Sequence, residues 1–233
     1  MLSPHSAYLI SDFVFPKLFP VQRYVICPMI DMANHRSAPT AKVEYEFFRH
    51  AYSLVTTTST GGKEDEITIS YGERSNDQLL QYYGFVETDN PNDVYVLPPI
   101  GEWTLDTSTS TAEGRLAALQ KAGLLTCPIV VTRDKGIDPV ALRALRVVYA
   151  TDAEWMEQAQ QAVTSIDAAT GSATEQNVRT VTRTLLQQEP DSKPTTLEQD
   201  RVLLARCTET EERLAIQFRM EKKKVLMEAI GKL

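Results

Sequence analysis

The stretches that decide the fold are PMIDMANH at residues 28–35 and ITISYGERSN at residues 67–76, the latter continuing to YYGF at residues 82–85. Both set polar side chains tightly between apolar ones, although polar residues mostly lie on protein surfaces. Between them, β-favouring residues predict antiparallel strands over residues 43–47 and 52–56, and the first of these also alternates apolar with charged residues. The same alternation predicts a half-buried strand over residues 66–71. The two polar stretches are therefore expected to lie at the ends of short strands.

A helix is predicted directly after the second stretch. Ser75 followed three residues later by Gln78 is the capping-box arrangement, and Gly84 is a typical helix stop. Residues 88–111 are rich in Asp, Asn, Pro, Ser and Thr, which predicts irregular chain with a domain boundary near residue 95. Before the first stretch, residues 7–26 predict a helix, a turn and a short buried strand.

The remainder of the chain has a helical pattern. Helices are predicted at residues 112–125, 139–149, 152–163, 174–188 and 197–230. The charged runs Glu209 to Glu212 and Lys222 to Lys224 are interpreted as solvated surface of the last helix. Short strands followed by helices predict the α+β class.

Composition excludes several kinds of function. The chain has 233 residues and a net charge of −7, and no apolar run approaches the roughly 20 residues that a membrane-spanning helix needs. An acidic surface repels phosphate backbones, so a Lys-bearing protein segment is a better candidate partner than nucleic acid. The cysteines Cys27, Cys127 and Cys207 are far apart and form no CxxC pair, which argues against a disulfide framework or a thiolate zinc cluster and favours an intracellular, reducing compartment.

From the residues alone, three interpretations remain open for Asp31, Asn34, His35 and Tyr71. They are ordinary structural residues of a core, or part of a metal site, or the wall of a cofactor or substrate pocket. A metal site would combine Asp31 and His35 with His50 or His5 as a two-histidine, one-carboxylate set. In a pocket, the amide and imidazole would recognise a ligand edge and the tyrosine hydroxyl would lie next to the reacting atom.

Together, the two stretches resemble the C-terminal part of a SET domain, in the branch typified by the Rubisco large-subunit methyltransferase. That branch joins a split SET domain to an all-helical substrate-binding domain. The SET resemblance spans about residues 7–90. The helical remainder, including DPVALRALR at residues 138–146 and EER at residues 211–213, is similar to the second domain. The implied architecture is the C-terminal portion of a SET domain at residues 1–95 and a substrate-binding domain at residues 96–233.

The resemblance implies a protein-lysine N-methyltransferase that uses S-adenosylmethionine and acts on a non-histone protein, with histidine as an alternative acceptor. It implies that Asn34 and His35 hold the adenosyl end of the cofactor, with Asp31 at the same wall. It places the Tyr71 hydroxyl beside the transferring methyl group, and Tyr83 along the channel for the target side chain. No metal is implied.

The sequence departs from the family pattern at three points. The Gly-rich turn of the N-terminal SET segment has no counterpart, the family's Ser-Arg pair is matched only by Ser11-Asp12, and Arg36 follows His35 where a small residue is usual. The expectation is therefore a fragment with an incomplete cofactor site. The alternative function is a catalytically inert protein-binding module that keeps the helical docking domain.

Overall fold

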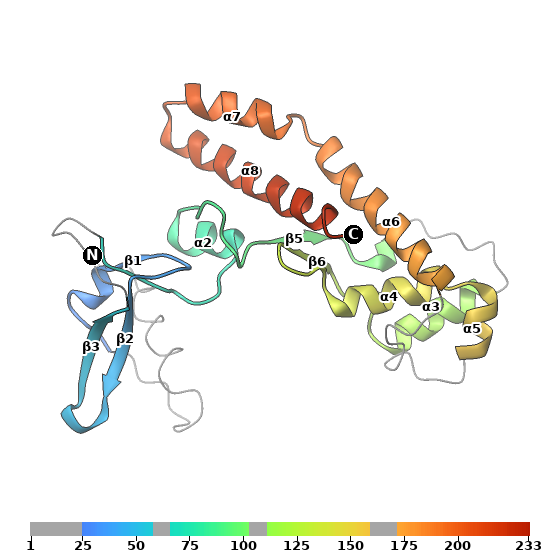
Figure 1. Ribbon diagram of the computed structural model, residues 1–233, viewed down its shortest axis with the longest axis horizontal. Helices are drawn as coiled ribbons and strands as arrows, with labels where there is room; N and C mark the ends of the chain where they lie inside the picture. Colours follow the sequence, from blue (N-terminus) through green and yellow to red (C-terminus); the bar gives the residue numbers. More distant parts are fainter. Residues whose placement is uncertain (1–24, 58–65, 103–110, 159–171) are drawn as a thin grey trace. The chain divides into compact units, whose positions relative to one another are not determined.

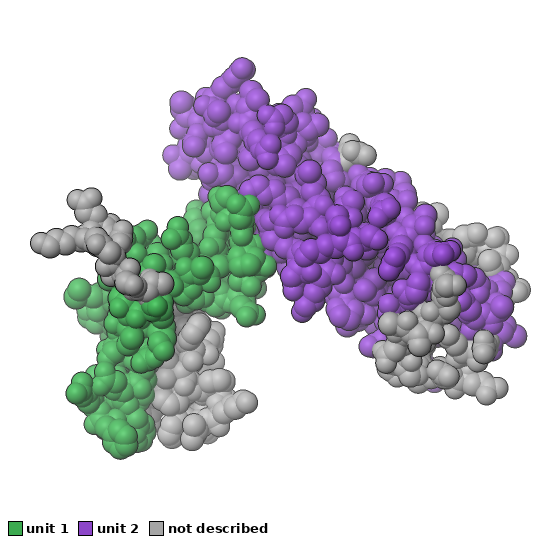
Figure 2. Space-filling view, viewed as in Figure 1, with its two compact units in different colours: residues 1–92 green, residues 93–233 purple. Residues whose placement is uncertain are grey.

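The computed structural model of the protein describes residues 25–57, 66–102, 111–158 and 172–233 (Figure 1). The chain divides into two compact units, residues 1–92 and residues 93–233 (Figure 2). Short strands in the first unit and mainly helices in the second confirm the predicted α+β class. The elements predicted before residue 25 lie outside the described residues. Every helix in the described part of the chain is either too short or too polar to span a lipid bilayer.

The first unit contains the predicted antiparallel hairpin. Strand β2, Ala41–Glu46, pairs with strand β3, Ala51–Thr56, around the short 3-10 turn η2, Phe47–Arg49. Val43 stands opposite Leu54 in this register, and both side chains pack on a small core formed by Cys27 and Ile30. Both strands were correctly predicted from their β-favouring residues, and the alternation in β2 reflects the packing of one face of the hairpin on this core.

A second strand pair joins the two polar stretches. Strand β1, Asn34–His35, follows the 3-10 turn η1, Ile30–Met32, and runs parallel to strand β4, Thr68–Ile69. Asn34 is aligned with Thr68 and His35 with Ile69. The strand predicted over residues 66–71 is shorter than expected. Its two residues nevertheless place the first stretch beside the second.

Helix α2, Asn76–Tyr83, begins and ends as predicted. The Ser75 hydroxyl accepts from the Gln78 N–H, and the Gln78 side chain accepts from the Ser75 N–H, which is the expected capping box. At the other end Gly84 adopts the left-handed conformation with φ of 76°. This geometry fixes the direction in which the chain leaves towards Phe85 and Glu87.

The second unit contains a small sheet that the sequence reasoning missed. Strand β5, Val94–Leu97, pairs antiparallel with β6, Ile129–Thr132, which in turn pairs with β7, Gly136–Ile137. The prediction of irregular chain over residues 88–111 was therefore wrong for β5. Its four residues are stabilised by a partner more than 30 positions away, and such non-local pairing leaves no local signal.

Helices form the rest of this unit. They are α3, Ala112–Lys121; α4, Pro139–Tyr149; α5, Asp152–Gln158; α6, Ser172–Asp191; α7, Leu197–Arg206; and α8, Thr210–Ile230; the turn η3, Ile100–Glu102, follows β5. Helix α4 has the predicted bounds because the Asp138 carboxylate accepts from the Val140 and Ala141 N–H groups ahead of Pro139. The core of the unit is built on fully buried leucines: Leu119, Leu145, Leu186 and Leu226.

The single helix predicted over residues 197–230 is wrong, because the chain reverses between α7 and α8. Cys207 is extended, with ψ of 129°. The Arg213 guanidinium donates to the carbonyls of Leu204 and Cys207, at 2.9 and 2.8 Å, and so satisfies the open end of α7. Helix α8 then packs against α7 (Figure 1).

The interpretation of Lys222 to Lys224 as solvated surface is also wrong. Lys222 and Lys223 are buried and Lys224 is partly buried. Their ammonium groups are paired with the carboxylates of Asp93, Asp200 and Glu221 respectively. Residues Glu209 to Glu212, in contrast, are exposed as expected. Lys222 and Lys223 are therefore part of the buried side of α8, and their burial is tolerated because each charge has a partner.

Candidate active site

His35 lies at the centre of the first unit's polar contacts. Its side chain is fully buried, and Nδ1 accepts from the main-chain N–H of Tyr71 at 2.9 Å. The other ring nitrogen, Nε2, has no partner in hydrogen-bonding geometry, and the nearest carboxylate oxygen, of Glu87, is 3.4 Å away. Burial lowers the pKa of His35 below its ordinary value, and the nearby Glu87 carboxylate offsets only part of that effect. The neutral imidazole is therefore the stable form.

Tyr71 connects the second stretch to the first through its side chain as well. The hydroxyl donates to the Ala33 carbonyl at 2.8 Å, immediately before Asn34. Burial, together with the neighbouring Tyr83, raises the pKa of Tyr71. The phenol therefore stays protonated across the physiological range, and its oxygen keeps lone pairs that can accept a further contact.

Aromatic rings gather around Tyr71. Ring centroids are 4.9 Å apart between Tyr71 and Tyr83, and 5.1 Å apart between Tyr71 and His35. Phe85 completes the group at 5.9 Å from His35 and 6.2 Å from Tyr83. Tyr83 comes from the last turn of α2, so the capping box and Gly84 stop set its position. The structure brings together His35, Tyr71 and Tyr83, as the sequence reasoning expected for a single pocket.

Asn34 and Asp31 are placed differently from these aromatic residues. The Asn34 side chain is exposed, and its amide donates to the Glu66 carboxylate at 2.5 Å. The Asp31 carboxylate turns back to accept from the Cys27 N–H at 2.8 Å. Asp31 thereby closes the turn that precedes Asn34. Its direct role in this structure is to shape that turn.

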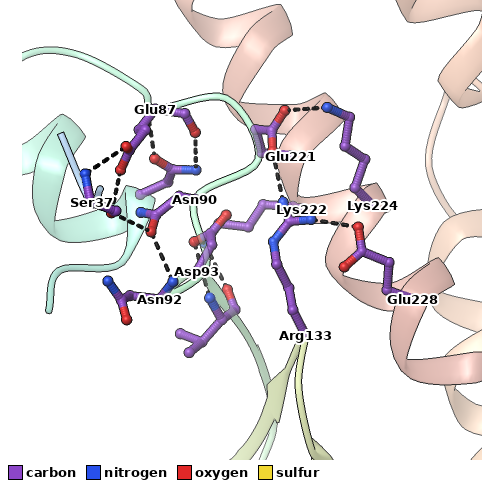
Figure 3. A network of polar contacts seen from close by, with 12 residues as sticks. Ser37, Glu87, Asn90, Asn92, Asp93, Arg133, Glu221, Lys222, Lys224 and Glu228 are labelled. Atoms are coloured by element: carbon purple, nitrogen blue, oxygen red, sulfur yellow. Dashed lines mark hydrogen bonds and ion pairs between the residues drawn. The ribbon is translucent and has the colours of Figure 1, made fainter. Parts of the chain in front are cut away.

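Sequence reasoning missed a further set of polar residues, which contact the chain just after the first stretch. Glu87 and Asn90 reach back to Ser37, just after the first stretch (Figure 3). The buried Asn76 side chain holds the backbone of Glu87 at both its N–H and its carbonyl, at 2.9 and 3.0 Å. A single sequence gives no warning of these contacts, because each residue by itself is typical of a turn or a helix start.

The metal interpretation has no support in the described residues. Asp31, His35 and His50 do not come together with one another, and no group of three or more possible His, Cys, Asp or Glu ligands is found in the described ranges. His5 lies outside those ranges. The cysteines are free thiols: Cys27 is buried, Cys127 exposed and Cys207 partly buried.

Comparison with known proteins identifies the class. Residues 106–226, slightly more than half of the chain, match the family described as Rubisco LSMT substrate-binding, where LSMT is the large-subunit methyltransferase. The chain therefore belongs to this family. The matched segment falls entirely in the second unit.

Curated relatives are similar to somewhat less than half of the chain. The chain is 30% identical over 101 residues to SET domain-containing protein 4 of Homo sapiens, covering 43% of this chain and 23% of that protein. It is 28% identical over 115 residues to N-lysine methyltransferase setd6 of Danio rerio, covering 48% of this chain and 24% of that protein. The chain thus spans about a quarter of the length of these relatives.

Solved structures of LSMT have the same fold. The structure described as Rubisco LSMT bound to AdoMet matches with a TM-score of 0.60 and 20% identity, covering 92% of this chain and 50% of that one. The structure of the LSMT SET domain bound to lysine and AdoHcy matches with a TM-score of 0.60 over 94% of this chain and 51% of that one, also at 20% identity. The resemblance to LSMT-like SET proteins is confirmed.

Proposed function

We propose that the protein is an S-adenosylmethionine-dependent protein-lysine N-methyltransferase acting on a non-histone protein. In this proposal residues 1–95 are the C-terminal portion of a SET domain, and residues 96–233 are the substrate-binding domain. The observation that carries the proposal is the parallel pairing of β1 with β4, which brings Tyr71 next to His35. The relatives described as N-lysine methyltransferases and the LSMT structures described as bound to AdoMet or lysine support the same activity.

The residues at the site fit a cofactor that has both polar and aromatic parts. In this proposal Asn34 and His35 hold the adenosyl end, with Asp31 shaping the wall beside them. The Asn34 side chain is exposed, with its amide donating to Glu66 at the surface, whereas both nitrogens of the His35 ring face protein groups inside the unit. His35 would therefore meet the cofactor through its main chain, and its imidazole would keep that main chain in place.

The chemistry requires alignment more than acid–base catalysis. S-Adenosylmethionine, when bound, supplies a methyl group activated by the sulfonium charge. The Tyr71 hydroxyl donates its hydrogen bond to the Ala33 carbonyl. The lone pairs of the same oxygen would orient the methyl group. The rings of Tyr71, Tyr83 and Phe85 exclude water from a target amine, which lowers the pKa of its ammonium form and favours the neutral nucleophile. Tyr83 would line the channel for the target side chain.

The test is methyl transfer by the purified chain from labelled S-adenosylmethionine to candidate proteins. Tyr71→Phe removes only the hydroxyl, and we expect transfer to fall by roughly a hundredfold because positioning is lost. Tyr82→Phe is the matched control, because Tyr82 is an exposed tyrosine of the same unit. Unchanged transfer by Tyr71→Phe would refute the role assigned to Tyr71. Mass spectrometry of the product identifies lysine or histidine as the acceptor.

A second candidate is an inert protein-binding module. The observation in its favour is that the family match covers the second unit and leaves residues 1–105 outside. Titration calorimetry of the chain with S-adenosylmethionine separates the two functions. Micromolar binding supports the enzyme, whereas an absence of binding combined with capture of a protein partner supports the module.

A further inference from the structure

The Glu87 carboxylate lies against two residues, His35 at the end of the first polar stretch and Ser37 just after it. One oxygen, Oε1, accepts from the Ser37 N–H at 2.8 Å. The other, Oε2, accepts from the Ser37 hydroxyl at 2.6 Å and lies 3.4 Å from Nε2 of His35 (Figure 3 shows the Ser37 contacts). The Glu87 side chain is itself mostly buried, with 18% exposure. One carboxylate thus accepts two hydrogen bonds from Ser37 and is the nearest carboxylate to the His35 ring.

The tautomer of His35 follows from its other contact. The Tyr71 main-chain N–H can only donate, so Nδ1 of His35 must accept, and the proton of the neutral ring resides on Nε2. A buried N–H without an acceptor is unfavourable. The acceptor nearest to this N–H among the ion pairs of the described residues is Glu87 Oε2. Glu87 therefore favours the one tautomer of His35 that can hold Tyr71.

The backbone of Glu87 is held in place by a residue of helix α2. Asn76, at the start of α2, binds the Glu87 N–H and carbonyl with its side-chain amide and is fully buried. Asn90 donates to the Arg74 carbonyl at 2.8 Å and also meets the Ser37 hydroxyl at 3.3 Å. The carboxylate is therefore fixed before any ligand arrives.

We propose that Glu87 is a positioning residue of the active site, which fixes the Asn34–His35 segment through Ser37 and fixes the Tyr71 backbone through the His35 ring. This inference rests on the proposed function for its catalytic meaning. The contact chain from Glu87 to His35 to Tyr71 is a property of the folded protein. It can be measured without cofactor or substrate.

Glutamine at position 87 is the informative substitution, because it keeps the shape and removes the second acceptor oxygen. If the amide oxygen faces the Ser37 N–H, the amide NH₂ meets the His35 Nε2–H, and two donors oppose each other. The ring then shifts its proton to Nδ1, and Nδ1 can no longer accept from Tyr71. Glu44→Gln is the matched control, because Glu44 is an exposed carboxylate of the same unit, paired with Lys42 at the surface.

The experiment combines nitrogen NMR of the histidine rings with amide hydrogen exchange on the full chain. In the wild type we expect the Nε2–H tautomer for His35; a ring protonated on Nδ1 would overturn the proposal without any variant. In Glu87→Gln we expect a rise of the Nδ1–H form and about a tenfold loss of protection at the Tyr71 amide. Glu44→Gln is expected to match the wild type. An unchanged His35 tautomer and Tyr71 amide in a folded Glu87→Gln variant would also overturn it.

Catalytic readouts separate this inference from the proposed function. If the wild type transfers methyl groups, Glu87→Gln should lower kcat and weaken cofactor binding while leaving the KM for the protein substrate within about twofold. If the wild type shows no transfer, the proposed function fails, and the NMR measurements still decide whether Glu87 positions His35 and Tyr71. Loss of transfer with unchanged NMR signals would contradict the positioning role.

Discussion

The Tyr71 main-chain N–H donates to Nδ1 of His35 across 36 positions of sequence. This hydrogen bond requires a neutral imidazole, because a protonated ring carries a hydrogen on Nδ1 and would oppose the N–H. Burial lowers the pKa of His35 from 6.5. Stability from this group is therefore fully present above pH 6.5 and is lost as the pH falls towards the lower pKa of the folded state.

The corresponding prediction concerns the peptide that contains Tyr71. We expect its amide exchange, corrected for the intrinsic pH dependence, to accelerate as the pH drops from about 7.5 to about 5.5. His50→Asn is the control, because His50 is exposed and asparagine tolerates its left-handed φ of 47°. That variant should show the same acceleration as the wild type. A peptide around Tyr71 whose protection does not change with pH would show that His35 is not the titrating group.

Much of the fold was predictable wherever the signal is local. The capping box at Ser75, the Pro139 helix start and the β-favouring residues of strands β2 and β3 are each recognised within a few positions of sequence. The pairing of β5 with β6 was missed because it depends on a partner far along the chain. The reversal at Cys207 was missed because it depends on a side-chain contact, from Arg213 to the carbonyls that end α7, and helix propensity does not reveal such a contact. Lys222 to Lys224 were misinterpreted because a lysine's burial is decided by its partner carboxylate.

The candidate site likewise contains residues that were predicted and residues that were missed. His35, Tyr71 and Tyr83 come together as the resemblance implied, because the β1–β4 pair and α2 position them. Glu87 and Ser37 could not be found from the sequence. Their importance arises from contacts 50 positions apart.

Gly84 ends α2 in a conformation that other residues adopt only with strain. Its φ is 76°, and a Cβ added there would meet no atom within 4 Å, so the cost of Gly84→Ala comes from the backbone alone. We expect a loss of about 1 kcal/mol in the free energy of unfolding. The measurement is urea denaturation followed by far-UV circular dichroism.

Gly114→Ala is expected to change the free energy of unfolding in the opposite direction, and it serves as the comparison. Gly114 lies inside α3, and a Cβ there would meet only Trp155 Nε1 at an ordinary 3.8 Å. Alanine should therefore raise the free energy of unfolding by about 0.5–1 kcal/mol through helix propensity. If Gly84→Ala also raises the free energy of unfolding, the left-handed geometry at Gly84 does not limit substitution.

Asp200 is the buried charge on which the α7–α8 hairpin depends. It is fully buried and accepts from Arg219 through both oxygens and from Lys223 at 2.6 Å. Burial acts to raise the pKa of Asp200, but the hydrogen bonds from Arg219, Lys223 and Thr195 outweigh it and lower the pKa to about 2. Asp200→Ala leaves Lys223 buried without its carboxylate, so we expect a loss of about 3–5 kcal/mol.

The control for Asp200 is Glu198→Ala in the same helix. Glu198 pairs with Arg201 at the surface, and such a pair contributes about 0.2–1 kcal/mol. Because the pKa of Asp200 is lowered, its stabilisation is present above about pH 4 and is lost as the pH falls towards 2. Thermal unfolding at neutral pH compares the two variants. Equal effects would mean that Asp200 behaves as a surface charge.

Lys222 of α8 binds the first two residues of the second unit, Asp93 and Val94. Its ammonium donates to the Asp93 carboxylate at 2.8 Å and to the Val94 carbonyl at 2.7 Å, and it lies 5.0 Å from the centre of the Phe218 ring. Asp93 is fully buried. Lys222→Met keeps the aliphatic stem and removes the charge, so the buried Asp93 carboxylate loses the Lys222 ammonium, and we expect a loss of about 3–5 kcal/mol in the free energy of unfolding.

The double variant Asp93→Asn with Lys222→Met decides whether the Asp93 charge causes the loss of stability in Lys222→Met. The double variant also removes the Asp93 charge that the Lys222 ammonium balances, so we expect it to recover at least half of the loss seen with Lys222→Met alone. Lys135→Met is the surface control, since Lys135 is largely exposed, and its effect should stay within about 0.5 kcal/mol. All of these are compared by urea denaturation at one pH. A double variant as unstable as Lys222→Met would show that lost packing around Phe218, and not the uncompensated Asp93 charge, sets the cost, because methionine lacks the ammonium that lies over that ring.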